Sequence, residues 1–187
     1  MRITTLQAIN TILSGLGETE LESLDSPSAD TSLAISLLNK TTEEIQLNGW
    51  HFNTEENYTF YPDKDGFIYI PADVHRIVFP SGCRRYAKKG NRLYDKVKGT
   101  FKIGFKVTAN IIRIVPFEEM PLTFRHYAAL RAARKFQNNT LSSNLIRSFQ
   151  EQDEAEARFA CLKEEQQISK PNLRYTKSRL KSGLPWL

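Results

Sequence analysis

The spacing of apolar residues predicts a short helix near the N-terminus. Four residues recur at the three- and four-residue intervals of one helical face: Leu6, Ile9, Leu13 and Leu16. Thr4 or Thr5 precedes this run as a suitable N-cap, and Gly15 and Gly17 end the helix.

A second, longer helix is predicted after a polar loop at residues 18–28. Its apolar positions are Leu33, Leu37, Leu38, Ile45 and Leu47. Ser28 or Asp30 can cap its start, and Asn48 with Gly49 breaks it. A loop of this length lets the two helices pack antiparallel.

Between residues 50 and 120 the pattern changes to that of short strands. Residues 58–61 and 67–70 flank an Asp-Gly turn at 63–66, which predicts a hairpin. A second turn is predicted at residues 88–91. Further strands are predicted at residues 75–79, 92–94, 101–107 and 111–115. In the segment 101–107, apolar and polar residues alternate, which favours a strand with one buried face. We therefore predict a small antiparallel sheet of about five or six strands.

Helical spacing returns after residue 120. Pro121 suits the first position of a third helix. The apolar side of that helix carries Phe124, Tyr127, Ala128, Leu130, Ala132 and Phe136. Ser142 or Ser143 starts a fourth helix. Its apolar residues are Leu145, Ile146, Phe149, Ala157, Phe159 and Leu162, and its expected solvated face carries Glu151, Asp153, Glu154 and Glu156. Pro171 ends helical structure.

This order of elements predicts an α+β fold. Residues 1–49 and 121–168 form an antiparallel helical bundle from the N- and C-terminal helices. Residues 50–120 form a small antiparallel β domain inserted in that bundle, and residues 169–187 form an extended C-terminal tail.

The junction between helix and sheet carries three aromatic rings in a row. Trp50 and Phe52 lie two residues apart, so in an extended segment both enter the seam between the bundle and the β domain. His51 then points away. Phe136 and Phe149 are the expected packing partners of the two rings.

The composition excludes several classes of protein. The chain has 187 residues, of which 40% are hydrophobic and 25% are charged, so it is too apolar for a disordered chain. No apolar run approaches the roughly 20 residues that a membrane span needs. The N-terminal segment is a poor signal peptide, and the distant Cys83 and Cys161 form no disulfide framework or metal knuckle. We expect a soluble chain from a reducing compartment, with no membrane partner.

Charged residues fall into blocks along the chain. Residues 1–80 hold 12 acidic and 4 basic side chains, and residues 81–106 hold 9 basic and one acidic. Residues 169–187 hold five basic side chains and no acidic one. Such blocks are typical of oppositely charged faces that meet neighbouring copies or other partners, and also of an unevenly charged solvated surface.

The basic block is interleaved with tyrosine and phenylalanine. Its candidate contact residues, facing another subunit or DNA, are Arg84, Arg85, Lys88, Lys89, Lys102 and Lys106. This mixture favours a nucleic-acid surface that contacts phosphates without reading the base sequence. The alternative is a solvated outer face, where lysines also protect strand edges from aggregation. Because the chain carries no motif for binding DNA or RNA, we favour the solvated face.

No pattern predicts catalysis, a cofactor or a metal site. His51, His75 and His126 lack a second ligand at metal-binding spacing, and His51 is expected to be packed between its aromatic neighbours. Cys83 and Cys161 are expected to be small buried residues. The sequence also lacks a phosphate-binding glycine loop. We therefore expect a protein that is not an enzyme and uses no cofactor.

Three segments carry a resemblance to a known family. The first contains Leu38, Asn39, Lys40, the stretch Asn-Gly-Trp-His-Phe-Asn at residues 48–53, Glu55 and Glu56. The second contains Glu119, Met120, Pro121, Phe124, Arg125, Ala132, Arg134 and Phe136. The third contains Gln150, Glu151, Asp153, Glu154, Ala155, Ala157 and Arg158. Together, in this order, they resemble the tail tubular protein A family of podoviruses, the short-tailed bacteriophages.

The resemblance implies a structural protein of the virion tail, made in the host cytoplasm. Family members form an adaptor ring of twelve copies between the capsid portal and the tail nozzle. The ring is part of the channel through which the genome leaves, and tail fibres anchor at its boundary with the nozzle. The implied partners are further copies of the chain, the portal protein, the nozzle protein, a tail fibre and passing genomic DNA.

Similarity to the wider class of head–tail adaptors assigns residues 169–187 to portal docking. The residues assigned to this contact are Arg174, Tyr175, Lys177, Arg179, Lys181 and Trp186. The alternative function is a nucleic-acid-binding module without sequence specificity that uses the basic strands at 84–106. A small enzyme with an unusual site is a further alternative.

Overall fold

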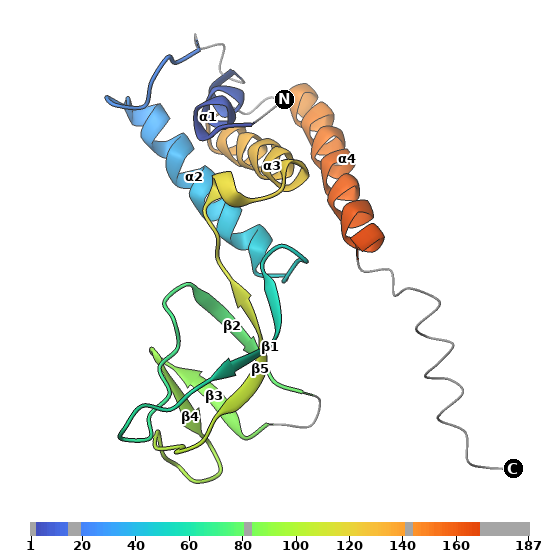
Figure 1. Ribbon diagram of the computed structural model, residues 1–187. Helices are drawn as coiled ribbons and strands as arrows, with labels where there is room; N and C mark the ends of the chain where they lie inside the picture. The colour runs from blue at the N-terminus through green and yellow to red at the C-terminus, as the bar shows by residue number, and fades with distance from the viewer. Residues whose placement is uncertain (1–2, 15–19, 81–83, 141–143, 169–187) are drawn as a thin grey trace, which may run out of the picture.

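Helices and strands occupy opposite ends of the molecule in the computed structural model (Figure 1). The structure describes residues 3–14, 20–80, 84–140 and 144–168, with side chains described outside 139–150. Within these residues the order of elements is α1 (Thr5–Ser14), α2 (Ala29–Gln46), β1 (Thr54–Phe60), β2 (Val74–Val78), β3 (Tyr86–Lys89), β4 (Arg92–Asp95), β5 (Val107–Arg113), the short 3₁₀ helix η1 (Phe117–Glu119), α3 (Leu122–Thr140) and α4 (Asn144–Ile168). Helices together with small antiparallel sheets make this an α+β protein, as predicted.

Both N-terminal helices begin at caps that the sequence predicts. The Oγ1 atom of Thr4 accepts a hydrogen bond from the backbone N–H of Gln7 at 3.2 Å. The Oγ atom of Ser28, rather than the side chain of Asp30, caps α2 by accepting from the N–H of Thr31 at 3.1 Å. Each bond satisfies one of the N–H groups that the first helical turn leaves unpaired.

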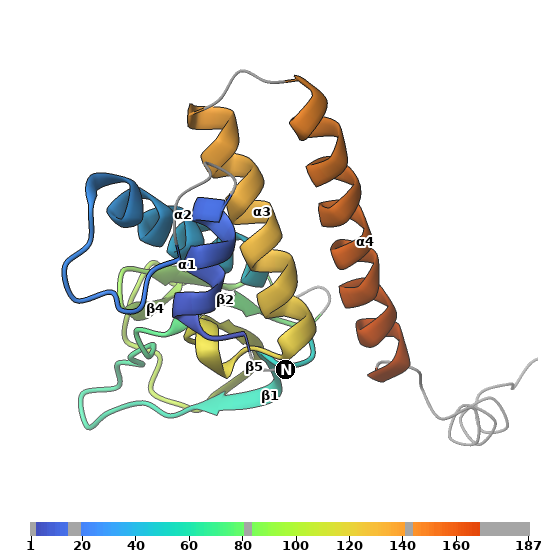
Figure 2. The ribbon, with the colours of Figure 1, turned by 90° about the horizontal axis from the view of Figure 1, so that it is seen from above.

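One apolar cluster includes side chains of all the described helices. Its largest fully buried members are Ile9, Ile12, Leu13, Leu38, Met120, Phe124 and Phe136. The helix α3 packs against α1, α2 and α4. It is therefore the central helix of this layer, with α2 on one side and α4 on the other (Figures 1 and 2).

The predicted helical core is right in part: Leu38 and Ile45 of α2 and Ala157 of α4 are buried as expected, whereas other predicted core residues of these helices are not. On α2 the buried stripe contains the small residues Thr31, Ala34 and Thr41 together with Leu38 and Ile45. On α4, Ala157 and Cys161 are buried. The larger residues that the apolar pattern placed in the core are exposed instead: Leu33, Leu47, Phe159 and Leu162. Small residues let two helix backbones approach closely, so they occupy the contact faces.

The prediction that Glu154 lies on a solvated face is also wrong. Its side chain is buried and accepts a hydrogen bond from Nε of Arg134. A second ion pair joins Glu154 to Nη1 of Arg131 at 3.5 Å. Because Glu154 lies three residues before Ala157, it shares the face of α4 that packs on α3. The arginines of α3 neutralise its buried charge.

The strands form a three-stranded antiparallel sheet in the order β1-β5-β2 and a β3-β4 hairpin. The predicted pairing of residues 58–61 with 67–70 is wrong, because β1 pairs with β5. The register shifts between Glu55 and Tyr58, where Asn57 has a φ of 57° and donates its N–H to Oδ1 of Asn110 at 3.0 Å. This irregularity bends β1 within the sheet.

Both predicted turns are present although one of them joins no hairpin. Asp63 Oδ1 accepts the N–H groups of Asp65 and Phe67, and Gly66 has a φ of 86°. The following segment, 67–70, makes only isolated bridges and buries Ile68 and Ile70. The turn at 88–91 joins β3 to β4 as predicted.

The predicted strand at 101–107 is not formed over its whole length. Gly104 adopts a φ of 75°, which interrupts the extended conformation, and Phe105 is 47% exposed. Regular pairing begins only at Val107. Ile103 and Val107 nevertheless belong to a second apolar cluster, whose other members are Phe60, Ile68, Ile70, Val74, Leu93, Ala109 and Ile111.

Two buried amide side chains hold the chain where it passes between the helices and the sheet. The Gln46 side chain donates to the carbonyl of Val115 at 2.9 Å and accepts the N–H of Val115 at 2.8 Å. The Asn53 amide donates to the carbonyls of Gln46 and Arg113 and accepts the N–H of Trp50. The segments that enter and leave the β region are thereby joined at one place.

The aromatic junction packs on Phe124. The rings of Trp50 and Phe52 lie with centroids 4.9 and 4.8 Å from that of Phe124, and Trp50 Nε1 donates to the carbonyl of Ile45 at 2.7 Å. Trp50 belongs to the helical cluster and Phe52 packs against it, whereas the sequence predicts both rings in the seam between the bundle and the β domain. Of the expected partners, Phe136 belongs to the same cluster, and the side chain of Phe149 lies outside the described ones.

The prediction that His51 points away from the seam is wrong. Its Nδ1 lies 2.8 Å from Oε2 of Glu165, near the end of α4, and its backbone N–H donates to the same oxygen at 3.0 Å. Its Nε2 lies 3.8 Å from Oε1 of Glu164. The ring also contacts Phe52 and Phe124. His51 thus joins the helix-to-sheet junction to the last turns of α4.

We predict that Gln46→Leu destabilises the protein although leucine has a similar size. The variant leaves the N–H and C=O of Val115 without their described partner, at a cost of about 1–3 kcal/mol for each buried group. Denaturant unfolding measures the loss. Gln167→Leu, at an exposed position of α4, is the control, and equal midpoints for the two variants would contradict the prediction.

We also predict that Trp50→Ala loses about 3–5 kcal/mol of stability, because it removes a buried ring and leaves a cavity beside Phe124. His51→Ala keeps the backbone bond to Glu165 and loses the ring's contacts with Glu165 and Phe124. We expect a smaller loss than for Trp50→Ala, because the His51 side chain remains partly exposed and leaves a smaller cavity. Thermal melts of the two variants compare these losses. If Trp50→Ala melts like the wild type, the ring does not support the junction.

Candidate assembly surfaces

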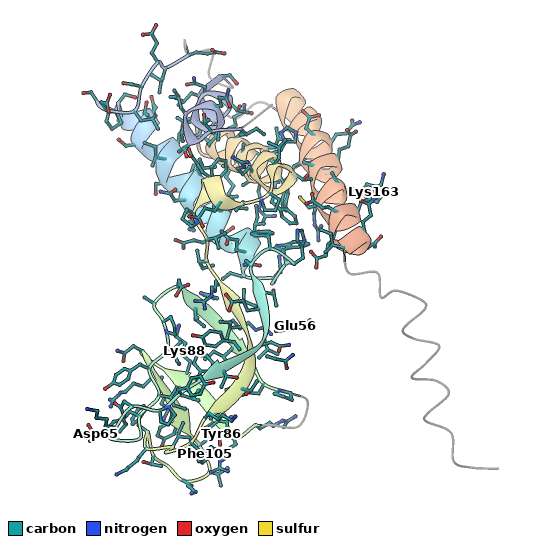
Figure 3. The ribbon with its side chains drawn as sticks, viewed as in Figure 1. Glu56, Asp65, Tyr86, Lys88, Phe105 and Lys163 are labelled. Atoms are coloured by element: carbon teal, nitrogen blue, oxygen red, sulfur yellow. The ribbon has the colours of Figure 1, made fainter. Side chains whose placement is uncertain are left out.

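The basic residues singled out in the sequence lie on the β3-β4 hairpin and on the loops beside it. Arg85 is half-buried, and the exposed members of this basic surface are Arg84, Lys88, Lys89, Lys102 and Lys106. Figure 3 shows Lys88 on one side of the β region and Glu56 on the opposite side. The strands therefore lie between Lys88 and the acidic start of β1.

Asp95, the single acidic residue of the basic block, is turned inward. Its Oδ2 accepts a hydrogen bond from Nε of Arg85 at 2.8 Å and forms an ion pair with Nη2 of the same residue at 2.7 Å. Its Oδ1 accepts the N–H groups of Val97 and Lys98, which shapes the turn after β4. The hydrogen bond from Arg85 is the main reason that the pKa of Asp95 falls from 3.8 to about 2. Asp95 therefore organises the hairpin and leaves the outer lysines uncompensated.

The aromatic rings of this surface are covered by cations of the same chain. Lys89 Nζ lies 3.5 Å from the centroid of the Tyr94 ring, and the guanidinium of Arg92 lies 4.5 Å from that of Phe101. Arg85 lies over the rings of Tyr86 and Phe105. These contacts stabilise the hairpin through cation–π attraction. They also occupy ring faces that stacked bases would need.

The side chains of three cations of the basic surface make no ion pair, hydrogen bond or cation–π contact with the described residues: Arg84, Lys102 and Lys106. By contrast, Lys88 donates to the carbonyl of Val74 at 2.5 Å, and Arg85 is held by Asp95. The structure therefore separates the six predicted residues into those that stabilise the β region and those that face outward.

The simplest interpretation of the charges predicts one acidic face opposite one basic face. The structure does not show this arrangement for the described residues. Glu44 is held by Lys135, which lowers the pKa of the carboxyl, and Glu55 is held by Arg113 on β5. Asp65 lies at the β end of the molecule (Figure 3). The exposed acidic residues of the loop before α2 lie at the other end (Figure 1). The two blocks of sequence are mixed in space.

Arg174, Tyr175, Lys177, Arg179, Lys181 and Trp186, which the sequence assigns to portal docking, lie outside the described residues. The helix that leads to them is described up to Ile168.

The described side chains show no arrangement suited to catalysis. An open cavity of about 430 Å³ lies between α1 and α3, and its lining includes Gln7, Glu20 and His126 without a paired nucleophile and base. Burial raises the pKa of the Cys161 thiol to about 12, so this cysteine is an inert core residue, as predicted. Cys83 lies outside the described residues. Among those residues no cluster of potential metal ligands occurs, and no helix has the length and apolar character of a membrane span.

Comparison with known proteins identifies the family. A family model described as "Tail tubular protein" matches residues 6–171. The chain belongs to the tail tubular protein family. A curated relative, tail tubular protein A of Klebsiella phage KP34, is 27% identical over 116 residues, which are 62% of this chain and 62% of the relative.

A tail tubular protein is a structural component of the virion tail, and the resemblance seen in the sequence is confirmed at this level. The basic surface, the exposed sides of α2 and α4, and the junction at Trp50 are therefore features of a tail subunit. For such a subunit, surfaces that remain uncovered in the single chain are candidate contacts with other tail components.

Sequence reasoning missed the polar residues that hold this tail tubular protein together: Gln46, Asn53, Glu154 and Glu165. Gln46 and Glu154 each occupy a position in a buried helical stripe, Gln46 directly after Ile45 and Glu154 three residues before Ala157. A polar residue inside such a stripe is a signal for a buried hydrogen-bond partner. The identity of the partner depends on contacts between elements far apart in sequence.

We predict that Asp95→Asn lowers the unfolding midpoint at neutral pH. The free energy of unfolding of this variant should also fall less steeply than that of the wild type as the pH is lowered. The folded-state pKa of Asp95 lies below its unfolded value, so the carboxylate stabilises the fold above about pH 4, and this contribution is lost as the pH falls toward 2. Denaturant curves at neutral pH and across this window check the prediction. Asp65→Asn, at an exposed turn position, is the control. Equal acid slopes for Asp95→Asn and the wild type would refute it.

Proposed function

We propose that this tail tubular protein is the adaptor ring of a short-tailed phage, placed between the portal of the capsid and the tail nozzle. The observation that carries the proposal is the family match over residues 6–171. In this role the protein forms part of the channel through which the genome is ejected, and it helps to anchor tail fibres. Its partners are other copies of itself, twelve in the ring, the portal protein, the nozzle protein and a tail fibre.

We assign each part of the chain a task in the ring. Residues 1–49 and 121–168 act as one helical bundle, residues 50–120 are the β insertion, and residues 169–187 are the tail that docks on the portal. Separate apolar clusters in the helices and in the strands support this division. The hydrogen bonds of Gln46 and Asn53 fix the two parts to each other, which a load-carrying joint requires.

The outward cations Arg84, Lys102 and Lys106 are the residues that we assign to the ejection channel or to a neighbouring subunit. Genomic DNA passes an adaptor without regard to its sequence, so contacts to phosphates are sufficient. Covering of the aromatic rings by Lys89 and Arg92 argues against base stacking, and hence against the alternative of an independent nucleic-acid-binding module. A purified monomer that binds DNA tightly, with affinity falling steeply as salt rises, would favour that alternative.

We predict that a chain truncated after residue 168 folds normally and no longer docks on its portal. The removed residues carry five basic groups and no acidic one, together with apolar residues that docking on a partner would bury. Co-sedimentation with the portal measures docking, and circular dichroism compares helix content. Electron microscopy of the complex formed by the full chain gives the number of copies. Undiminished docking of the truncated chain, or its unfolding, would overturn the assignment of the tail.

A further inference from the structure

The helical layer has two lateral edges that none of the described elements covers. The helices α2 and α4 lie on opposite sides of α1 and α3, and this order is visible in both Figure 1 and Figure 2. Each edge helix buries one face in the layer and leaves the other open. A subunit with unlike uncovered edges is suited to head-to-tail contacts, which close into a ring.

The open side of α2 carries a stripe with a seven-residue period. Leu33, Lys40 and Leu47 recur at this spacing and therefore lie on one face, opposite the buried residue Leu38. Leu33 is 38% exposed and Leu47 is 37% exposed, although leucine gains from burial. We call these three residues the α2 stripe.

The open side of α4 carries a second apolar stripe. Phe159 is 69% exposed and Leu162 is 39% exposed, whereas the small residues Ala157 and Cys161 face α3. Glu156 and Lys163 flank the two apolar residues, and Figure 3 shows Lys163 on the side of α4 away from α3. We call Glu156, Phe159, Leu162 and Lys163 the α4 stripe.

We propose that the α4 stripe of one copy packs along the α2 stripe of the next copy. The inference rests on the proposed ring and names the contact between its subunits. Both edge helices run from the top to the bottom of Figure 1, so a rotation that sets two copies side by side brings α4 and α2 together with their chains running in the same sense, and Figure 2 shows that the two helix axes are inclined to each other. The contact covers the exposed apolar residues of both edges at once.

Charge complementarity favours this occupant. In a parallel alignment the cation Lys40 faces the anion Glu156, and six or seven residues further along, Leu47 reaches Leu162 and Lys163. Lys40 makes no ion pair within 4 Å among the described side chains and acts only at longer range on Glu44, whose pKa it helps to lower, so its ammonium group is open to a neighbour. A two-fold pair of α4 helices would instead leave the α2 stripe exposed and would end at two copies.

The test uses two variants of the full chain that each spoil one edge. Phe159→Asp places a charge in the α4 stripe, and Leu47→Asp places one in the α2 stripe. Both positions are exposed in the single chain, so circular dichroism should show unchanged folding. Val97→Asp is the matched control, because Val97 is 77% exposed in the turn after β4, away from both edges. Sedimentation measures self-association, alone and with the purified portal.

The expected result is that each edge variant weakens self-association about tenfold or more, while Val97→Asp leaves it unchanged. An equimolar mixture of the two edge variants forms dimers and nothing larger, because the intact α4 stripe of Leu47→Asp meets the intact α2 stripe of Phe159→Asp. The exchange Lys40→Glu weakens association, and Glu156→Lys in the same chain restores it.

The other possible outcomes distinguish a wrong contact, a wrong arrangement of subunits and a wrong proposed function. Rings that tolerate both edge variants overturn the α4–α2 contact and leave the proposed function standing. Loss of association in Phe159→Asp alone, without rescue in the mixture, indicates a two-fold α4 contact or binding of the chain's own tail, and overturns the head-to-tail arrangement. A wild-type chain that never associates, even with the portal, contradicts the proposed function itself.

Discussion

The fold depends on a chain that crosses between helices and strands twice at the same place. The β region is inserted between α2 and α3, so the entering segment after Gln46 and the leaving segment around Val115 must lie side by side. One backbone hydrogen bond joins the two segments directly, from the N–H of Arg113 to the carbonyl of Asn53 at 2.9 Å, and the buried amides of Gln46 and Asn53 add further bonds between them. Gly49 has a φ of 75° at this crossing, and a Cβ atom there would lie 2.6 Å from Ile112.

The attachment of α4 differs in kind from that of the other helices. The buried residues described on α4 are Glu154, Ala157 and Cys161, of which only the last two are apolar and both are small. Ion pairs with arginines of α3 and the contact between Glu165 and His51 therefore contribute much of the attachment of α4. Larger apolar residues of α4 remain outside. This distribution is costly for an isolated chain and suits a subunit that buries the same residues in an assembly.

The charged groups of the β region fall into two sets: those that pair with each other within it, and cations that face outward. Asp95 and Arg85 neutralise each other within the hairpin, and Arg113 joins Glu55 of β1 to Asp73 just before β2 across the sheet. The uncompensated cations lie at the exposed end of the hairpin and its loops. The internal pairs fix the geometry, and the outer cations give the field that acts on neighbouring subunits or on passing DNA.

Local patterns by themselves determined much of this protein: which segments are helical and which region forms strands, the caps at Thr4 and Ser28, and both turns. Three segments also carried the family resemblance. Only the tertiary structure decided that β1 pairs with β5 and that Glu154 and His51 face α3 and α4 respectively. It also decided that Leu47 and Phe159 stay outside. The physical reason is that a period in sequence defines a face of an element, whereas the partner of that face is set by packing between residues far apart in the chain.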